Sequence, residues 1–280
     1  MVLESGSYGA KFNSTITRRQ LKYGGDLHAY NFSLFFQFST NSPQSRPKTN
    51  NILGTIFLLH GYGLNKATMM PWGFLLAEAG YRVVLVDFRG HGNSTGDRIY
   101  FGSVEKTDLV QCLDALEQRN ICEGPVGVLG ISYGAVLALQ WAAVDPRVQS
   151  VTAISPYSNP GTAVEQFLTT YVPQLPWWTD RNAAEEVAHN LAAECADLTT
   201  ETAVRRIKNP ILFVRGENDE LCSKADLSRL EAVAPVGSEM KEVPIVNHLV
   251  VGLCVSQLGG TMTNWFRGHL AREQAREAFP

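Results

Sequence analysis

A serine lies between two glycines in the segment Gly130-Ile131-Ser132-Tyr133-Gly134. The apolar run 126–129 comes directly before this segment, and the run 135–144, which has the composition of a buried helix, comes directly after it. A G-x-S-x-G sequence between a strand and a helix is typical of a nucleophile elbow, a strained turn that exposes the serine hydroxyl at a helix N-terminus. The backbone amides there favour developing negative charge. The sequence therefore predicts that Ser132 is a nucleophile.

A base must accept the proton of the serine, because a serine hydroxyl is otherwise a weak nucleophile. His248 follows the predicted last strand, 240–245, where a loop returns to the carboxyl edge of the sheet. His28 lies in the N-terminal segment, His189 on an alanine-rich helix and His269 in the polar C-terminal tail, and these three are expected to be surface residues. His248 is therefore the predicted base.

A carboxylate must hold the imidazole in the right tautomer and stabilise its cation. The acidic turn 215–220 follows the apolar run 211–214, again at the end of a predicted strand. Asp219 fits this role best. Glu217 and Glu220 are the alternatives in the same turn.

A tetrahedral intermediate also needs hydrogen-bond donors that are held in place in advance. The backbone N–H of Tyr133, directly after the serine, is one candidate. The segment 60–63, with the sequence HGYG, follows the apolar run 52–59, and its glycines permit a tight turn that would direct the N–H of Tyr62 to the same point. His60 is expected to be a hydrogen-bonded scaffold residue and not a second base.

The elements that must position these residues alternate along the chain. Mainly apolar runs without a polar alternation occur at 52–59, 81–86, 125–129, 148–154 and 211–214. Such runs are typical of strands that are covered on both faces, as in a parallel sheet under helices. Because helical patterns separate them, the sequence predicts a doubly wound, mostly parallel α/β fold.

An N-terminal antiparallel hairpin is predicted before this alternation begins. β-favouring stretches lie on both sides of Gly24-Gly25-Asp26, between about residues 11 and 38.

Residues 158–207 interrupt the alternation. They are too long for one crossover helix, contain three prolines and include an alanine-rich helical run. We predict a small helical cap at 158–207, inserted into a core formed by 1–157 and 208–280. Four aromatic residues of the cap could line a substrate pocket or pack the cap onto the core, and both interpretations stay open. They are Phe167, Tyr171, Trp177 and Trp178.

The composition bears on which partners, cofactors and locations are expected for this protein. The 24 basic and 27 acidic residues give a formal charge of −3, which does not favour a nucleic-acid partner or an anionic membrane surface. No apolar run approaches the roughly 20 residues that a membrane helix needs. The five cysteines show no C-x-x-C spacing, and no metal or cofactor is expected. The polar N-terminal residues do not resemble a secretory signal, so we expect a cytoplasmic protein.

The combined motifs resemble the α/β-hydrolase superfamily, and most of all its branch of lysophospholipases, carboxylesterases and serine aminopeptidases. They are HGYG at 60–63, DFRGHGNS at 87–94, GISYG at 130–134, G-x-x-D at 216–219 and the late His248. The similarity covers roughly residues 53–270, and the order Ser132, Asp219, His248 is the one that these hydrolases use. The resemblance implies that Asp87, Arg89 and His91 shape a loop beside the active site.

The residues and the resemblance together imply a serine hydrolase that cleaves carboxylic esters of a small-molecule acyl substrate through an acyl-enzyme intermediate. Amides or peptides and thioesters are alternative substrates for the same fold. A ligand-binding module without catalysis is an alternative of a different class. The oligomeric state does not follow from the sequence.

Overall fold

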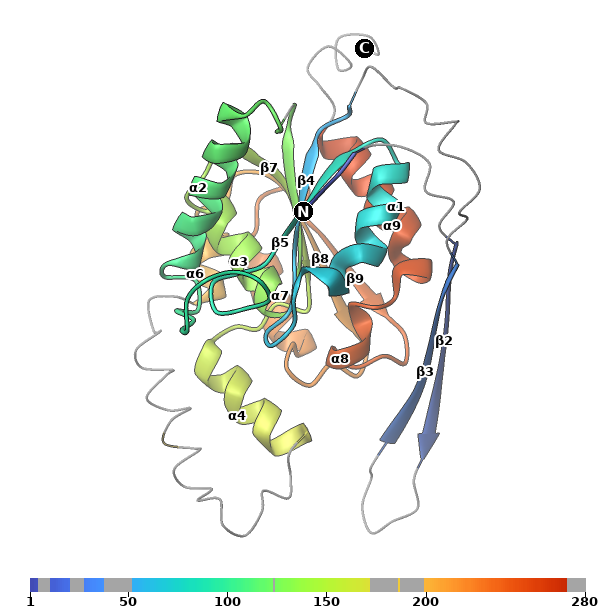
Figure 1. Cartoon of the computed structure of the whole chain (residues 1–280). Helices are drawn as coiled ribbons and strands as arrows, with labels where there is room; N and C mark the ends of the chain where they lie inside the picture. Colours follow the sequence, from blue (N-terminus) through green and yellow to red (C-terminus); the bar gives the residue numbers. More distant parts are fainter. Residues whose placement is uncertain are drawn as a thin grey trace.

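The computed structural model describes residues 1–4, 11–20, 28–37, 52–122, 124–171, 186 and 199–270 of the chain, with the backbone alone for 11–20 and 28–37. A seven-stranded sheet forms the centre of the molecule and helices cover both of its faces (Figure 1). The predicted doubly wound α/β fold is thus confirmed.

The central sheet has the strand order β1-β5-β4-β6-β7-β8-β9. Its strands are β1 (Val2–Leu3), β4 (Thr55–Leu59), β5 (Arg82–Val86), β6 (Val126–Ile131), β7 (Val148–Ile154), β8 (Ile211–Gly216) and β9 (Glu239–Val243). All neighbours pair in parallel except β1, which runs antiparallel to β5 at the edge. β1 was not predicted from the sequence, because two residues are too short for any periodicity.

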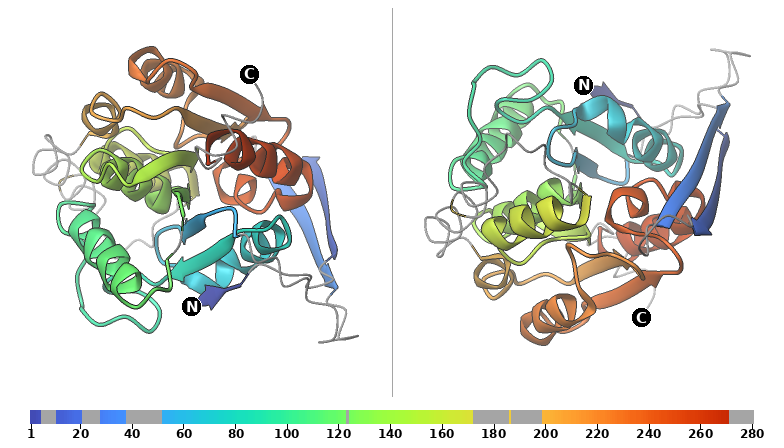
Figure 2. Two further views of the ribbon diagram at one scale, coloured as in Figure 1. Left: turned by 90° about the horizontal axis from the view of Figure 1, so that it is seen from above. Right: turned by 90° about the horizontal axis from the view of Figure 1, so that it is seen from below.

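Two layers of helices cover the sheet (Figure 2). One face carries α1 (Met70–Glu78), which follows the 3₁₀ turn η1 (Lys66–Met69), and α9 (Val255–His269). The other face carries α2 (Glu105–Gln118), α3 (Tyr133–Ala142) and α7 (Lys224–Val233). In β4, Ile56 packs in the core cluster of α1 and α9, and the next residue, Phe57, packs in the cluster of α2 and α3. Because successive side chains of a strand point to opposite faces, a strand covered on both sides has to be apolar throughout.

The predicted N-terminal hairpin is present as a separate two-stranded sheet. Its strands β2 (Lys11–Gln20) and β3 (His28–Gln37) are antiparallel, and Lys11 pairs with Gln37. The hairpin lies beside α9 and does not join the central sheet (Figure 1).

The region predicted as a cap contains two described helices, α4 (Pro160–Tyr171) and α6 (Thr200–Val204). α4 lies at the same end of the sheet as the short helix α8 (His248–Val251), which is the lower end in Figure 1. α6 packs against α3 and α7, and its Val204 lies in the core. Apart from 186, residues 172–198 are outside the described part of the chain, so the cap boundaries at 158 and 207 stay a prediction.

Within the described ranges, none of the helices is long and apolar enough to cross a membrane.

Candidate active site

Ser132 lies at the junction of β6 and α3 with φ 54° and ψ −114°. A residue with a side chain rarely adopts a positive φ, and such a conformation costs about 1–3 kcal/mol. Hydrogen bonds on both sides hold it. The Ser132 N–H donates to Ile154 O at 2.8 Å, and Ser132 O accepts from Ala135 N at 2.9 Å. The half-buried serine is therefore held by the strand beside it and by the first turn of α3.

Glycines on either side of Ser132 allow the strand and the helix to approach closely. A methyl group on Gly130 would lie 2.1 Å from Gly134 O, and a methyl group on Gly134 would lie 2.2 Å from Leu59 O. Both oxygens belong to the backbone and cannot move aside easily. The G-x-S-x-G sequence is thus a steric requirement of this turn.

His248 is the first residue of α8 and its imidazole faces Ser132. The distance between Ser132 Oγ and His248 Nε2 is 2.8 Å. The indole N–H of Trp72 donates to Gly252 O at 2.8 Å, at the end of α8. Gly252 packs on Ile131, since a methyl group at Gly252 would lie 2.7 Å from Ile131 Cγ2. These contacts hold α8 against the end of β6. His248 was expected in a loop, because a single helical turn has no detectable periodicity.

Asp219 lies on the other side of the imidazole, with 2.9 Å between His248 Nδ1 and Asp219 Oδ1. The same oxygen accepts the backbone N–H groups of Leu221 at 3.1 Å and Cys222 at 2.9 Å. Asp219 is 4% exposed and His248 is 6% exposed. With the Nδ1–H of His248 donating to Asp219 Oδ1, the Nε2 lone pair faces the Ser132 hydroxyl. The three predicted side chains therefore form one hydrogen-bonded chain.

The two other carboxylates of the acidic turn belong to residues at its exposed surface. Glu217 Oε2 accepts the N–H of Ile245 at 2.8 Å, and both Glu217 and Glu220 are exposed. Of the three carboxylates considered from the sequence, the structure brings only that of Asp219 to His248.

Backbone hydrogen bonds join the turn that carries Asp219 to the segment that precedes His248. Glu217 N donates to Val243 O at 2.8 Å, and Asn218 N donates to Val246 O at 2.9 Å. A methyl group on Gly216 would lie 2.4 Å from Val246 O, so only glycine permits this approach. The distance between Asp219 and His248 is therefore set by the backbone.

Arg215 stabilises the turn that carries Asp219 through hydrogen bonds to its backbone carbonyl groups. Its guanidinium, on a residue that is 5% exposed, donates to Cys222 O at 2.9 Å, to Glu217 O at 3.2 Å and to Asp219 O at 3.3 Å, and it forms an ion pair with Glu242. Arg215 was not among the residues predicted from the sequence. A cation in a strand that is otherwise fully buried was the signal, since such a charge needs several partners.

The HGYG segment lies directly beside Ser132. A methyl group on Gly61 would lie 3.9 Å from Ser132 Cβ. Neither the Tyr62 N–H nor the Tyr133 N–H donates to another group of the described residues. Two backbone donors that have no partner among the described residues thus lie next to the serine, in the segments that the sequence predicted. The Tyr62 side chain is 66% exposed, whereas that of Tyr133 is buried.

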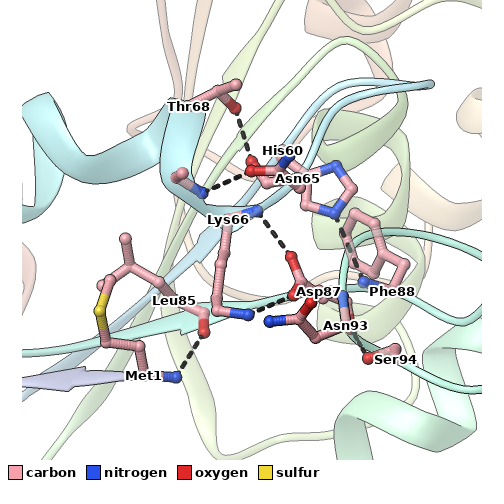
Figure 3. A network of polar contacts seen from close by, with 11 residues as sticks. Met1, His60, Asn65, Lys66, Thr68, Leu85, Asp87, Phe88, Asn93 and Ser94 are labelled. Carbon is pink, nitrogen blue, oxygen red and sulfur yellow. Dashed lines mark hydrogen bonds and ion pairs between the residues drawn. The ribbon is translucent and has the colours of Figure 1, made fainter.

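The Asp87 carboxylate anchors the chain that follows the HGYG segment (Figure 3). It accepts Lys66 N at 2.7 Å and Asn93 N at 3.0 Å, and it forms an ion pair with the Lys66 ammonium. Burial opposes ionisation of this carboxyl, but the hydrogen bonds from Asn93 and Lys66 outweigh it and lower the pKa of Asp87 to about 2. Asp87 therefore ties the loop after β4 to the loop after β5.

His60 contributes a second tie between these loops. Its Nδ1 lies 2.8 Å from Gly61 O, and its Nε2 accepts Phe88 N–H at 3.4 Å. Burial lowers the pKa of His60, which keeps the ring neutral, with a proton for Gly61 O and a lone pair for Phe88. The predicted scaffold position of His60 agrees with these contacts.

The aromatic residues predicted for a cap pocket are only partly described. Phe167 is half-exposed on α4. The backbone of Tyr171 ends α4, and its side chain is outside the described part of the chain, as are Trp177 and Trp178. Their role in a pocket stays a prediction.

The part of the chain that the structure describes contains no group of three or more His, Cys, Asp or Glu side chains that could hold a metal ion.

Comparisons with known proteins agree with this architecture. Residues 54–206 match the sequence profile of the α/β hydrolase fold. The uncharacterised protein YqkD of Bacillus subtilis strain 168 is 24% identical over 211 residues, which are 74% of this chain and 64% of YqkD. The chain thus spans less than two thirds of that relative. The 2-(acetamidomethylene)succinate hydrolase of Mesorhizobium japonicum is 26% identical over 70% of this chain and 81% of its own length. Among solved structures, the Pyrococcus furiosus esterase Pf2001 superposes with a TM-score of 0.67 at 19% identity, over 94% of this chain and 92% of the esterase.

Proposed function

We propose that this chain, which belongs to the α/β hydrolase fold family, is a serine hydrolase that cleaves carboxylic esters through an acyl-enzyme intermediate. The observation that carries the proposal is the continuous chain of hydrogen bonds from Ser132 through His248 to Asp219. A buried carboxylate, an imidazole and a strained, half-buried serine in this order are what nucleophilic catalysis requires.

In the first step, Ser132 Oγ attacks the carbonyl carbon while His248 Nε2 takes the hydroxyl proton. Asp219 holds the Nδ1 proton and stabilises the imidazolium that forms. The N–H groups of Tyr62 and Tyr133 donate to the oxyanion, and one such donor is typically worth roughly 3–4 kcal/mol of transition-state stabilisation. The bond between the carbonyl carbon and the alcohol oxygen then breaks, His248 gives its proton to that oxygen, the alcohol leaves, and the acyl group stays on Ser132.

In the second step, water takes the place of the alcohol. His248 accepts a proton from the water, the resulting hydroxide attacks the acyl carbon, and the carboxylic acid leaves as His248 returns the proton to Ser132 Oγ.

Apolar side chains next to the site support an ester with an apolar acyl or alcohol part. Tyr62 and Leu64 lie in the loop after β4, and Leu249 directly follows His248. All three side chains are exposed to solvent beside the site residues. The presence of an esterase among the similar structures is consistent with this choice. Amides and thioesters are the alternative substrates for the same residues.

The test combines labelling with turnover. The protein should react with a fluorophosphonate probe and hydrolyse p-nitrophenyl esters of graded chain length. Ser132→Ala should abolish both, whereas Ser103→Ala, which changes an exposed serine outside the site, should leave both unchanged. Aminoacyl anilides and acyl thioesters, assayed in parallel, decide between the substrate classes. If Ser132→Ala still labels and still hydrolyses esters, Ser132 is not the nucleophile. If the unaltered protein neither labels nor turns over any acyl substrate, a binding module is the better explanation.

A further inference from the structure

The direction of the Tyr62 N–H depends on the peptide planes of the HGYG segment. Gly61 O accepts hydrogen bonds from His60 Nδ1 at 2.8 Å and from Leu64 N at 3.2 Å. Because a trans peptide is planar, fixing Gly61 O also fixes the direction of the Tyr62 N–H on the opposite side of the same plane. The next plane, between Tyr62 and Gly63, needs a separate restraint, since Gly63 has φ 70° and carries no side chain.

His91 supplies this restraint. The Gly63 N–H donates to His91 Nε2 at 3.2 Å, and His91 Nδ1 lies 3.1 Å from the carbonyl oxygen of Arg89. A carbonyl only accepts, so Nδ1 carries the proton and Nε2 is left with the lone pair that Gly63 needs. His91 is 8% exposed, and its ring is therefore held in one orientation.

The loop that carries His91 is itself braced. The Arg89 guanidinium makes two hydrogen bonds of 2.6 Å to the carboxylate of Asp108 on α2. The Ser94 hydroxyl donates to Asp87 O at 2.7 Å, and Ser94 N donates to His91 O at 3.0 Å. His91 thus projects from a turn that is hydrogen-bonded on both sides.

His91 also contacts the segment that supplies the second oxyanion donor. Its ring stacks on that of Tyr133, with the centroids 6.0 Å apart and the planes at 29°. The ring of Tyr62 meets it edge-on, with the centroids 5.9 Å apart. The same imidazole therefore lies against both residues whose backbone amides flank Ser132.

We propose that His91 is a positioning residue for the oxyanion hole, which aligns the Tyr62 and Tyr133 amides through its acceptor at Nε2 and its ring. This inference rests on the proposed function. His91 does not touch the reacting atoms. Its effect should therefore fall on the transition state, where the oxyanion develops, and not on substrate binding.

Two substitutions separate the acceptor from the ring. His91→Phe keeps a ring against Tyr62 and Tyr133 and removes the acceptor, whereas His91→Gln keeps an acceptor at a similar reach. His269→Phe is the control: His269 was expected on the surface but is half-buried at the end of α9, where its ring packs on Trp265 and not on the candidate site. Because complete loss of an oxyanion donor typically costs 10²–10³ in kcat, misalignment of a donor should cost roughly 10- to 100-fold. We expect this loss in kcat for His91→Phe, with KM changed less than about threefold, and a recovery of most of it in His91→Gln.

Two further measurements do not depend on turnover. Affinity for a boronic acid inhibitor, which forms a tetrahedral adduct with serine, should fall in His91→Phe in parallel with kcat. Amide hydrogen exchange at Gly63, followed by NMR, should become faster in His91→Phe and stay slow in His91→Gln.

The measurements distinguish a failure of the His91 proposal from a failure of the proposed function. The proposal is overturned if folded His91→Phe retains wild-type kcat, because the ring alone then suffices. It is also overturned if His91→Gln loses as much kcat as His91→Phe, because restoring an acceptor then has no effect. If the unaltered protein hydrolyses no acyl substrate, the proposed function fails. The exchange of the Gly63 amide then still decides whether His91 holds this loop.

Discussion

Asparagine in place of Asp219 should lower kcat for ester hydrolysis roughly 10³-fold while keeping His248 in its present orientation. The three hydrogen bonds to Asp219 converge on Oδ1, from His248 Nδ1 and from the N–H groups of Leu221 and Cys222. Oδ2 is buried and has no partner among the described residues. An asparagine can therefore place its oxygen where Oδ1 lies and its NH₂ where Oδ2 lies. The opposite rotamer would point the NH₂ at three donors, so it is excluded.

The expected magnitude follows from the charge alone, because the acceptor and the tautomer survive. Two unit charges about 4 Å apart, at an effective dielectric constant of about 20, interact by about 4 kcal/mol. Losing that stabilisation of the imidazolium corresponds to roughly 10³ in rate. Asp219→Ala removes the acceptor as well, so that nothing holds the Nδ1 proton, and its loss should reach roughly 10⁴. The buried NH₂ of asparagine should also cost about 1–3 kcal/mol of folding stability.

The assay is the steady-state hydrolysis of a p-nitrophenyl ester by the two Asp219 variants, with Glu217→Gln as the matched control. Glu217→Gln removes a charge from the same turn but leaves the contact with His248 intact, so it should change kcat by less than about threefold. The reasoning is wrong if Asp219→Asn retains more than a tenth of wild-type kcat. It is equally wrong if Glu217→Gln is the more damaging change, because the orienting carboxylate would then be a different one.

Two further predictions concern the frame around the site. Gly134→Ala should destabilise the protein by about 3 kcal/mol or more, since its methyl group would lie 2.2 Å from Leu59 O. Gly260→Ala on α9 has open space around it and should stabilise the protein by about 0.5–1 kcal/mol. Urea unfolding measures the change in unfolding free energy of both variants. The lowered pKa of Asp87 means that its ionised form stabilises the fold fully above about pH 4, and that this contribution is lost as the pH falls from about 4 towards 2. The difference in unfolding free energy between the wild type and Asp87→Asn should therefore shrink over that range, and a constant difference would contradict the contacts of Asp87.

The fold could be predicted from the sequence because its strands are covered on both faces. The run 148–154, for instance, is the strand β7 with the same bounds. Strand ends were harder, and the run 52–59 is a strand only from Thr55. β1 was missed for a different reason. Only its pairing with β5 makes Val2–Leu3 a strand, and pairing across some 80 residues leaves no local pattern.

The residues of the candidate site also differ in how far the sequence predicts them. Ser132 and its glycines could be identified because the steric demands of the turn are local. Asp219 was preferred from the sequence, but Glu217 and Glu220 stayed as alternatives because all three lie in one turn. Only the contacts in the structure separate them, since Asp219 Oδ1 meets His248 Nδ1 and Glu217 accepts the N–H of Ile245. The hydrogen bond from Gly63 to His91 joins residues 28 positions apart through a single amide, so no spacing rule indicates it. For Arg215 the sequence offered one signal, a cation within a buried strand, but not its partners.

The sheet order explains why the proposed catalytic chain needs an imidazole from a third segment. Ser132 follows β6 and Asp219 follows β8, and β7 lies between these two strands. Neighbouring strands are about 4.8 Å apart, so roughly 10 Å separates the two strand ends, which is too far for direct contact between a serine and an aspartate side chain. The imidazole of His248 fills this gap and contacts Ser132 at 2.8 Å and Asp219 at 2.9 Å. α8, which carries His248, can reach this position because the chain returns to the same end of the sheet after β9, the neighbour of β8. The HGYG segment follows β4, which is paired directly with β6, so its amide lies beside Ser132 without any bridging group. The position of its strand in the sheet therefore determines whether a group can lie next to Ser132, as the HGYG amide does, or needs an intervening side chain, as Asp219 needs His248.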